Sequence, residues 1–422
     1  MVAEALDALG QPWAASVVFD EVIDELVDLD GMSASGPHRP EGEVSNQLVL
    51  LLGGLWERGW EPIDVHHVLR RHGDGRAVRL LLALIAAEAA AGGRAGPMPK
   101  RWRHQMQRLG IEVPEQPFDG LPDLGADEVV PRWRETQRLN VADSLEVSLR
   151  VLAQLRCLGR LSPLGDPPSR WGVPTVGPGP ALAGEPKHFG TIRALLAKAE
   201  STSFPAEAEA FTAKAQELMV RHSIHDVARA ADANDDLVAM VRPHRIAIEQ
   251  PYGPEKVQIL AAVAGPNGVE VVWDDEWALA TVVGLPADVE LVELLFSSLL
   301  VQATQAMGQA IGDASHRRAP AFRRAFLLAF SRGLGPRLTA ASARAGRQAT
   351  TRHGTSLVPL LARRRDAVRR VTEQMFPDRS PMRTRMVDAE GWEAGNRAAA
   401  AAVVAPLRAA TDRPDSTTAR RS

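Results

Sequence analysis

The sequence contains one cysteine, Cys157, among 422 residues, and this scarcity excludes several classes of site. A disulfide scaffold, a paired-cysteine redox centre and a cysteine-ligated zinc ion each need at least two thiols in the chain. Cys157 lies in the apolar helical pattern LRVLAQLRCLGRL, so we expect a buried, unreactive thiol. The best histidine group, His222 and His225 with Asp226, has too few ligands for zinc and suits a helix end better. We therefore predict no metal and no cofactor.

The chain also lacks a large net charge, a secretion signal and a membrane-spanning run. The formal net charge is −3, so any charged partner must be recognised locally. Glu4 and Asp7 stand where a signal peptide would carry positive charge. The longest apolar run, residues 80–91, is too short to span a bilayer and contains Glu88. We expect a cytoplasmic protein without a membrane partner.

Familiar catalytic motifs are missing as well. The sequence has no GxxxxGK[ST] phosphate loop, no GxSxG nucleophile elbow and no GxGxxG motif after a strand. The helix expected from Pro286 follows two strands, as the HExxH helix of many metalloproteases does, but it carries no histidine. The catalytic residues of any enzyme activity are therefore unknown at this stage.

What is present is a chain long enough for two or three hydrophobic cores, with 45% hydrophobic and 24% charged residues. Residues 1–161 carry apolar side chains at helical spacing and are predicted to form a helical region. Residues 162–186 are rich in proline and glycine, which interrupt helices, and are predicted to form a linker. In the first region we expect helices over 48–56, 62–72, 78–91, 98–109 and 141–161.

The pattern changes again in the second half. Residues 240–249, 268–273 and 277–284 have the short apolar runs of strands, and a helix is expected near 254–264. Asp274 and Asp275 fit the turn between the second and third strands. Long helices follow, and we expect Gly333, Gly335 and Pro336 to break or kink one of them. Residues 240–405 are thus predicted to be an α+β module, and residues 411–422 a disordered tail.

Between the linker and this module lies a helical hairpin, predicted over 187–230. Ile192, Leu195, Leu196 and Ala199 form one apolar stripe, and Ala208, Phe211, Ala215, Leu218 and Met219 form another. Ser201, Thr202 and Ser203 offer oxygens to the next helix, whose first turn contains Pro205 and Glu207. Every local preference agrees with the others, as expected for a stable unit.

This hairpin, IRALLAKAESTSFPAEAEAFTAKAQELMVRHSI, resembles the domain-of-unknown-function family numbered 2786, found in bacteria and phages. The resemblance rests on an IRxLLAxAES start, a Glu-Ala pair after the turn and a KAQELM-type finish, and it covers about a tenth of the chain. The two strands before VGLPADVELVELLFSSLL, and AFRRAFLLAF after it, resemble more loosely the segment that usually accompanies this hairpin. The family implies no activity and no catalytic residue.

The strongest anomaly is a basic segment. Residues 313–370 contain fourteen arginines against Asp313 and Asp366, a net charge of +12, which leaves −15 for the remainder. Such asymmetry indicates an acidic partner, either nucleic acid or an acidic protein surface, because the arginine guanidinium fits phosphate. The alternative is pairing within the chain, with acids such as Asp274, Asp275 and Glu276. The predicted contact residues are Arg323, Arg324, Arg337, Arg344, Arg347, Arg363, Arg364 and Arg365.

Together these observations predict a predominantly helical α+β protein: a helical region, a linker, the hairpin and a small strand-containing module capped by long helices. Our first hypothesis for its function is a protein that binds nucleic acid or an acidic partner through the arginines. The second is a hydrolase with a carboxylate-lined site near Asp274, Asp275 and Asp288. The third is a purely structural interaction module.

Overall fold

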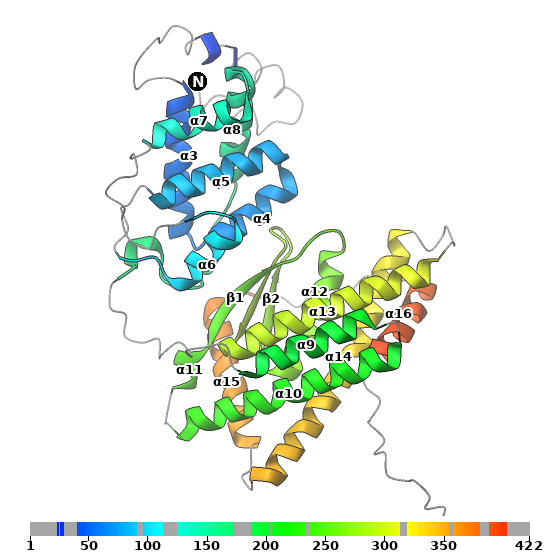
Figure 1. Cartoon of the computed structure of the whole chain (residues 1–422). Helices are drawn as coiled ribbons and strands as arrows, with labels where there is room; N and C mark the ends of the chain where they lie inside the picture. The colour runs from blue at the N-terminus through cyan, green and yellow to red at the C-terminus, as the bar shows by residue number, and fades with distance from the viewer. Residues whose placement is uncertain are drawn as a thin grey trace, which may run out of the picture. The chain divides into compact units, whose positions relative to one another are not determined.

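A computed structural model of the chain confirms the predominantly helical α+β class and divides it into two compact units, Met1–Val176 and Gly177–Ser422 (Figure 1). The described residues are 23–24, 26–28, 40–90, 96–112, 125–172, 187–202, 204–232, 236–312, 319–353, 358–379 and 388–402. The predicted tail at 411–422 and most of the amphipathic segment before residue 30 lie outside them.

The N-terminal unit is built from helices packed around α3 (Pro40–Glu57). The other helices are α4 (Pro62–His72), α5 (Gly75–Ala90), α6 (Lys100–Arg108), α7 (Val129–Gln137) and α8 (Val141–Arg156). Leu48, Leu52 and Leu55 of α3 are fully buried, and α3 packs on α5, α7 and α8. The start of α8 is set by Asn140, whose Oδ1 accepts a hydrogen bond from the amide of Asp143 at 2.7 Å.

Two details of this unit differ from expectation. Helix α8 ends at Arg156, so Cys157 is its C-terminal cap and its side chain is exposed; the expectation of a buried thiol was wrong. Helix α7 was not predicted, because its short apolar pattern follows a segment rich in Pro, Gly and Asp. Its buried residues Val129, Val130 and Trp133 supply enough contact to form it.

The first part of the predicted linker belongs to the N-terminal unit. Trp171 is buried, with its ring centroid 5.1 Å from that of Trp102, which in turn lies 5.4 Å from that of Trp56. The amide of Leu161 also donates to the carbonyl of Arg58 at 3.0 Å. Residues 162–172 are therefore held by aromatic packing despite their composition, and residues 173–186 lie outside the described part.

The second unit begins with the predicted hairpin, α9 (Lys187–Ser201) and α10 (Pro205–Asp232). Ile192, Leu196, Ala215 and Met219 are buried, while Leu195, Phe211 and Leu218 lie half-buried at the edges of the two stripes. In the turn, the hydroxyl of Thr202 accepts from the amide of Phe204 at 3.2 Å and donates to Glu207 at 2.7 Å. Residues of both helices join the main core of the unit, so the hairpin is an integral part of the unit.

The three predicted strands form one antiparallel sheet in the order β1-β3-β2: β1 (Arg242–Ala247), β2 (Glu270–Asp274) and β3 (Leu279–Gly284). Val282 of β3 lies opposite His244 of β1 and Val271 of β2. A short helix α11 (Leu237–Met240) precedes β1. Helix α12 (Gly253–Ala264) and the turn η3 (Gly265–Asn267) connect β1 to β2, as expected.

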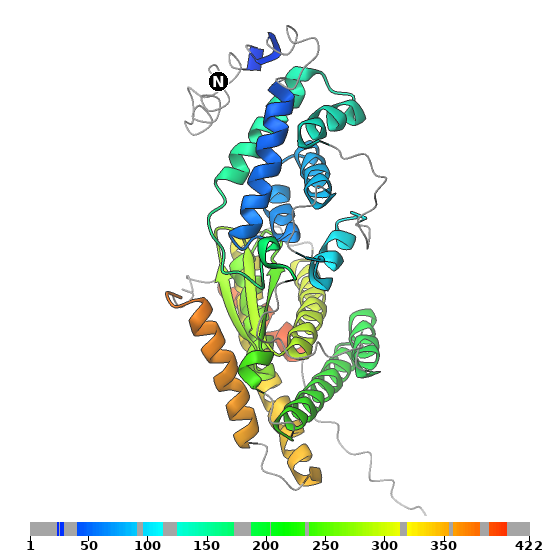
Figure 2. The ribbon, with the colours of Figure 1, turned by 90° about the vertical axis from the view of Figure 1, so that its left-hand side faces the viewer.

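Helices cover both faces of this sheet. The helices are α13 (Pro286–Ile311), α14 (Pro320–His353), α15 (Val358–Met375) and α16 (Ala389–Ala402). Ala280 and Val282 share a core with α12, α13 and α14, whereas Val283 packs with Ala367 and Val368 of α15. Figure 2 shows α15, in orange, on one side of the sheet and α13 on the other. The outer side of α15 is thereby left to solvent.

Helix α14 runs unbroken through Pro336, so no helix starts there. Helix α13 is the one helix of the described part that is long and apolar enough to cross a membrane, but half of its most apolar window is buried inside the unit. Leu291, Val292, Leu295 and Leu299 account for this composition by filling the core. The expected cytoplasmic location stays a prediction.

Candidate functional site: the arginines of helices α14 and α15

The arginines at the start of α14 lie close to the body of the unit. Arg324 is 58% exposed, and its Nε is 3.9 Å from Oε1 of Glu255 on α12. Arg323 is partly buried, with its Nε shielded from solvent. The Glu255 side chain is only 14% exposed, but at 3.9 Å the contact is a long one, and the Arg324 side chain remains largely accessible to solvent. Arg317 and Arg318 lie outside the described residues.

Farther along α14, Arg337 has a structural partner. Its Nη1 donates to the carbonyls of Ala399, at 3.0 Å, and Ala400, near the end of α16. A cation there complements the negative end of the helix dipole. Burial raises the pKa of the nearby Glu209, and the charge of Arg337 partly offsets that rise. Arg337 therefore holds two helices together.

Arg344 and Arg347 follow on the same side of α14, since seven residues are close to two helical turns. Arg344 is partly buried and Arg347 is exposed. The three arginines predicted to share this side of α14 therefore differ: Arg337 binds the carbonyls of α16, Arg344 is partly buried, and Arg347 is exposed.

Arg364 of α15 is the best-enclosed arginine of the predicted set, with 5% of its surface exposed. Its Nη2 is 3.1 Å from Oδ2 of Asp288 in the first turn of α13, and its Nη1 donates to the hydroxyl of Ser223 on α10. Gly268 has a positive φ of 68°, and a β-carbon there would overlap the guanidinium. Arg364 therefore joins four segments of the unit from inside and does not reach the surface.

The arginines beside it on α15 face solvent. Arg363 and Arg365, both in the predicted set, are exposed, as are Arg369 and Arg370. Arg369 pairs with Asp366 at 2.9 Å between Nη2 and Oδ1. Arg363, Arg365 and Arg370 form no ion pair with any residue of the described part. We call Arg363, Arg365, Arg369 and Arg370 the α15 arginine face.

The structure separates the carboxylates of the hydrolase hypothesis. Asp274 pairs with Leu279 at one end of the β2–β3 hairpin, whereas Asp288 follows Gly284 at the other end. Five residue steps along β3 correspond to about 17 Å. Asp274 accepts from the amide of Trp277 at 3.1 Å, and Asp275 accepts from Nε1 of Trp273 at 3.3 Å. The described residues contain no group of three or more His, Cys, Asp or Glu side chains that could hold a metal.

Two polar clusters were not predicted as sites. In the second unit, the Gln216 amide donates to Asn267 and to Ser342, each at 2.9 Å. Gln216 and Asn267 are buried, and Ser342 is half-buried. The sequence could have indicated that Gln216 is buried, because it directly follows Ala215 on the buried stripe of the hairpin. A buried polar side chain needs a partner, and this network links the hairpin to α14 and to the turn before β2.

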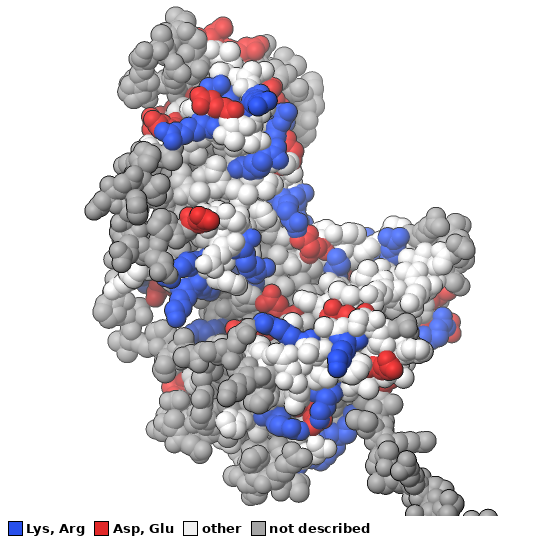
Figure 3. All heavy atoms as spheres, in the orientation of Figure 1, with Lys and Arg blue, Asp and Glu red and all other residues white. Residues whose placement is uncertain are grey.

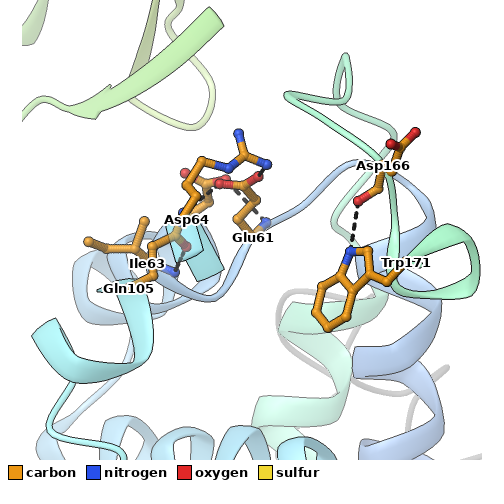
Figure 4. A network of polar contacts seen from close by, with 7 residues as sticks. Glu61, Ile63, Asp64, Gln105, Asp166 and Trp171 are labelled. Carbon is orange, nitrogen blue, oxygen red and sulfur yellow. Dashed lines mark hydrogen bonds and ion pairs between the residues drawn. The ribbon is translucent and has the colours of Figure 1, made fainter. Parts of the chain in front are cut away.

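The other cluster lies in the N-terminal unit (Figure 4). Glu61 is buried and forms an ion pair with Arg101 and a hydrogen bond with Gln105, whose own Oε1 accepts from the amide of Ile63 at 3.4 Å. Asp64 accepts from the amide of Glu61 at 3.2 Å. The cluster ties α6 to the start of α4. The only sequence signal was the acidic first turn of α4 beside a basic helix.

Comparison with known proteins supports the resemblance of the hairpin. The model of a family described as "protein of unknown function (DUF2786)" matches residues 189–226. The matched residues are α9 and most of α10, including Gln216 and Ser223 of the buried clusters. Comparisons with curated proteins and with solved structures give no match. The N-terminal unit has no recognised family.

Proposed function

We propose that this chain is a binding protein that contacts the phosphate backbone of nucleic acid through the α15 arginine face. The observation that carries the proposal is the electrostatics of α15. Its solvent side bears Arg363, Arg365, Arg369 and Arg370 against two acids, Asp366 and Glu373, and one of these acids already pairs within the helix. A surface with surplus guanidinium groups suits a polyanion.

Nucleic acid is favoured over an acidic protein because the face offers no apolar anchor. Stable protein interfaces rely on large apolar or aromatic side chains in their centres. The large hydrophobic side chains exposed in the described residues are Leu50, Phe204 and Val301, and none belongs to α15. The buried face of α15 packs on the sheet, which holds the arginines on a rigid helix. Contacts to phosphate from such a face would not depend on base sequence.

The test is charge reversal at two positions of the face in the full chain. Arg363→Glu combined with Arg370→Glu should weaken binding to a short DNA duplex by about tenfold or more at low salt, because two phosphate contacts become repulsive. Fluorescence anisotropy of a labelled duplex measures this. The thermal unfolding temperature should stay nearly constant, since both side chains are exposed and unpaired among the described residues.

A matched control separates a local contact from overall charge. Arg132 on α7 and Arg397 on α16 are exposed and each pairs with a glutamate four residues earlier. Changing both to Glu alters the net charge by the same amount as the α15 variant. The proposal expects the control to bind within about twofold of the parent. Equal loss in both variants, or no binding by the parent, would contradict the proposal.

A further inference from the structure

The N-terminal unit carries a second basic surface, on α6. This nine-residue helix, KRWRHQMQR, contains Lys100, Arg101, Arg103 and Arg108 with His104, and no acidic residue. Lys100, His104 and Arg108 follow one another at intervals of four residues and are all exposed. At 1.5 Å rise per residue they form a row about 12 Å long on one side of the helix. We call these three residues the α6 row.

The opposite side of α6 is firmly anchored. Trp102 is buried between the rings of Trp56 and Trp171, and Met106 is also buried. Gln105 and Arg101 bind the buried Glu61 in the network of Figure 4. The α6 row is therefore presented by a helix that cannot rotate without breaking a buried polar network and an aromatic cluster. A fixed row loses little conformational freedom on binding.

The charge of the row is not balanced locally. Arg101 forms an ion pair with Glu61, whereas Lys100, His104 and Arg108 form no ion pair with any described residue. Figure 3 shows basic side chains, in blue, over the region of α6 in Figure 1. Gln107, also exposed, adds an amide donor beside the row. The surface thus offers cations and a hydrogen-bond donor.

We infer that the α6 row is a second binding surface for the phosphate backbone of nucleic acid. A phosphate backbone fits because duplex DNA carries one negative charge per about 1.7 Å of its axis, so the Lys100 ammonium and the Arg108 guanidinium can each reach a phosphate. The His104 imidazole between them can donate a hydrogen bond to phosphate oxygen. The exposed side of α6 has no large apolar residue, so it lacks the anchor that a protein partner would need. The inference is independent of the proposed function, because it concerns other residues on another unit.

The experiment uses the full chain and a short DNA duplex. Lys100→Glu with Arg108→Glu should weaken binding at low salt by about tenfold, whether or not the α15 face carries its own two reversals. The control is Arg132→Glu with Arg150→Glu, since both arginines are exposed on the same unit and pair with a glutamate four residues earlier. It should bind within about twofold of the parent. Unchanged unfolding temperatures would show that the row variant keeps its fold.

The outcomes for the two surfaces can be told apart. If the α6 variant binds like its control while the α15 variant is weakened, the inference about α6 is wrong and the proposed function stands. If the α6 variant alone is weakened, the inference stands and the proposed function fails. If the duplex binds neither the parent nor any variant, both are wrong. If an acidic protein such as a poly-glutamate chain competes as strongly as the duplex, the assignment to nucleic acid is overturned.

Discussion

At the scale of single residues, α15 shows how one residue type acquires opposite roles over three consecutive positions. Arg363, Arg364 and Arg365 differ by about 100° of rotation about the helix axis, so only Arg364 points to the sheet side with Ala367 and Val368. The sequence predicted a basic cluster but could not show which of its arginines is buried and which are exposed. The burial of Arg364 depends on contacts with Asp288, Ser223 and Gly268, which are distant along the chain and come together only after folding.

The first prediction concerns this buried pair. Arg364→Ala should lower the free energy of unfolding by about 3–5 kcal/mol, because it leaves the carboxylate of Asp288 buried without its cation. Arg363→Ala on the same helix should change the free energy by about 0.5 kcal/mol or less. Urea unfolding of the two variants measures both values. Similar small effects would mean that Arg364 lies at the surface in solution.

At the scale of elements, local patterns were sufficient where an element is amphipathic and well capped. The hairpin was predicted because Ile192, Leu196, Ala215 and Met219 repeat at helical spacing and Thr202 suits the turn, and all of these features are present. Proline was misleading in α14. Phe322, Phe326, Phe330, Leu334 and Leu338 form a buried row four residues apart, and this row continues past the exposed Pro336. Tertiary packing outweighs the lost backbone hydrogen bond.

The pairing of α14 with α16 depends on small residues that no propensity scale would single out. A β-carbon at Gly391 would overlap the carbonyl of Phe322, and one at Gly395 would overlap that of Phe326. The two glycines, four residues apart on α16, therefore let the helix backbones approach closely. Gly333 of α14 meets Ala399 in the same way. Gly391, Gly395 and Ala399 of α16 are therefore small residues on the side that faces α14.

The second prediction tests that contact. Gly395→Ala should lower the free energy of unfolding by about 1–3 kcal/mol, because the new methyl group forces α16 away from α14. Gly346→Ala, at a position on α14 with open space around the missing β-carbon, should be neutral or stabilise by up to about 1 kcal/mol. Thermal unfolding of the pair of variants is the measurement. A stabilised Gly395→Ala protein would show that the helices are not in close contact.

At the scale of the whole molecule, the excess of arginines in residues 313–370 has two different structural roles. Some of these arginines bind within the second unit: Arg364 pairs with Asp288, and Arg337 donates to carbonyls near the end of α16. Others are exposed on the α15 arginine face. Composition could predict the excess of positive charge, but which arginines are buried and which are exposed could be found only from the structure. Composition also did not show that the carboxylates of the hydrolase hypothesis are separated, with Asp274 at one end of a hairpin and Asp288 beyond the other end.

The division into two units was also only partly predictable. The proline- and glycine-rich composition of 162–186 indicated a boundary, and the chain does divide there, at Val176 and Gly177. The aromatic packing of Trp171 against Trp102 keeps the first part of that segment with the N-terminal unit. Pairwise contacts of this kind have no local signature, so the exact limit of the unit could be found only from the structure.

The measurement that tests the central claim most directly is the salt dependence of binding to a DNA duplex. The account predicts that the logarithm of the association constant falls linearly with the logarithm of the salt concentration, by about 0.9 per phosphate neutralised. The Arg363→Glu, Arg370→Glu variant should show a slope smaller by about 2 than that of the parent, because each reversal removes one phosphate contact. A parent slope near zero, or equal slopes for parent and variant, would contradict a phosphate-binding role for the α15 arginine face.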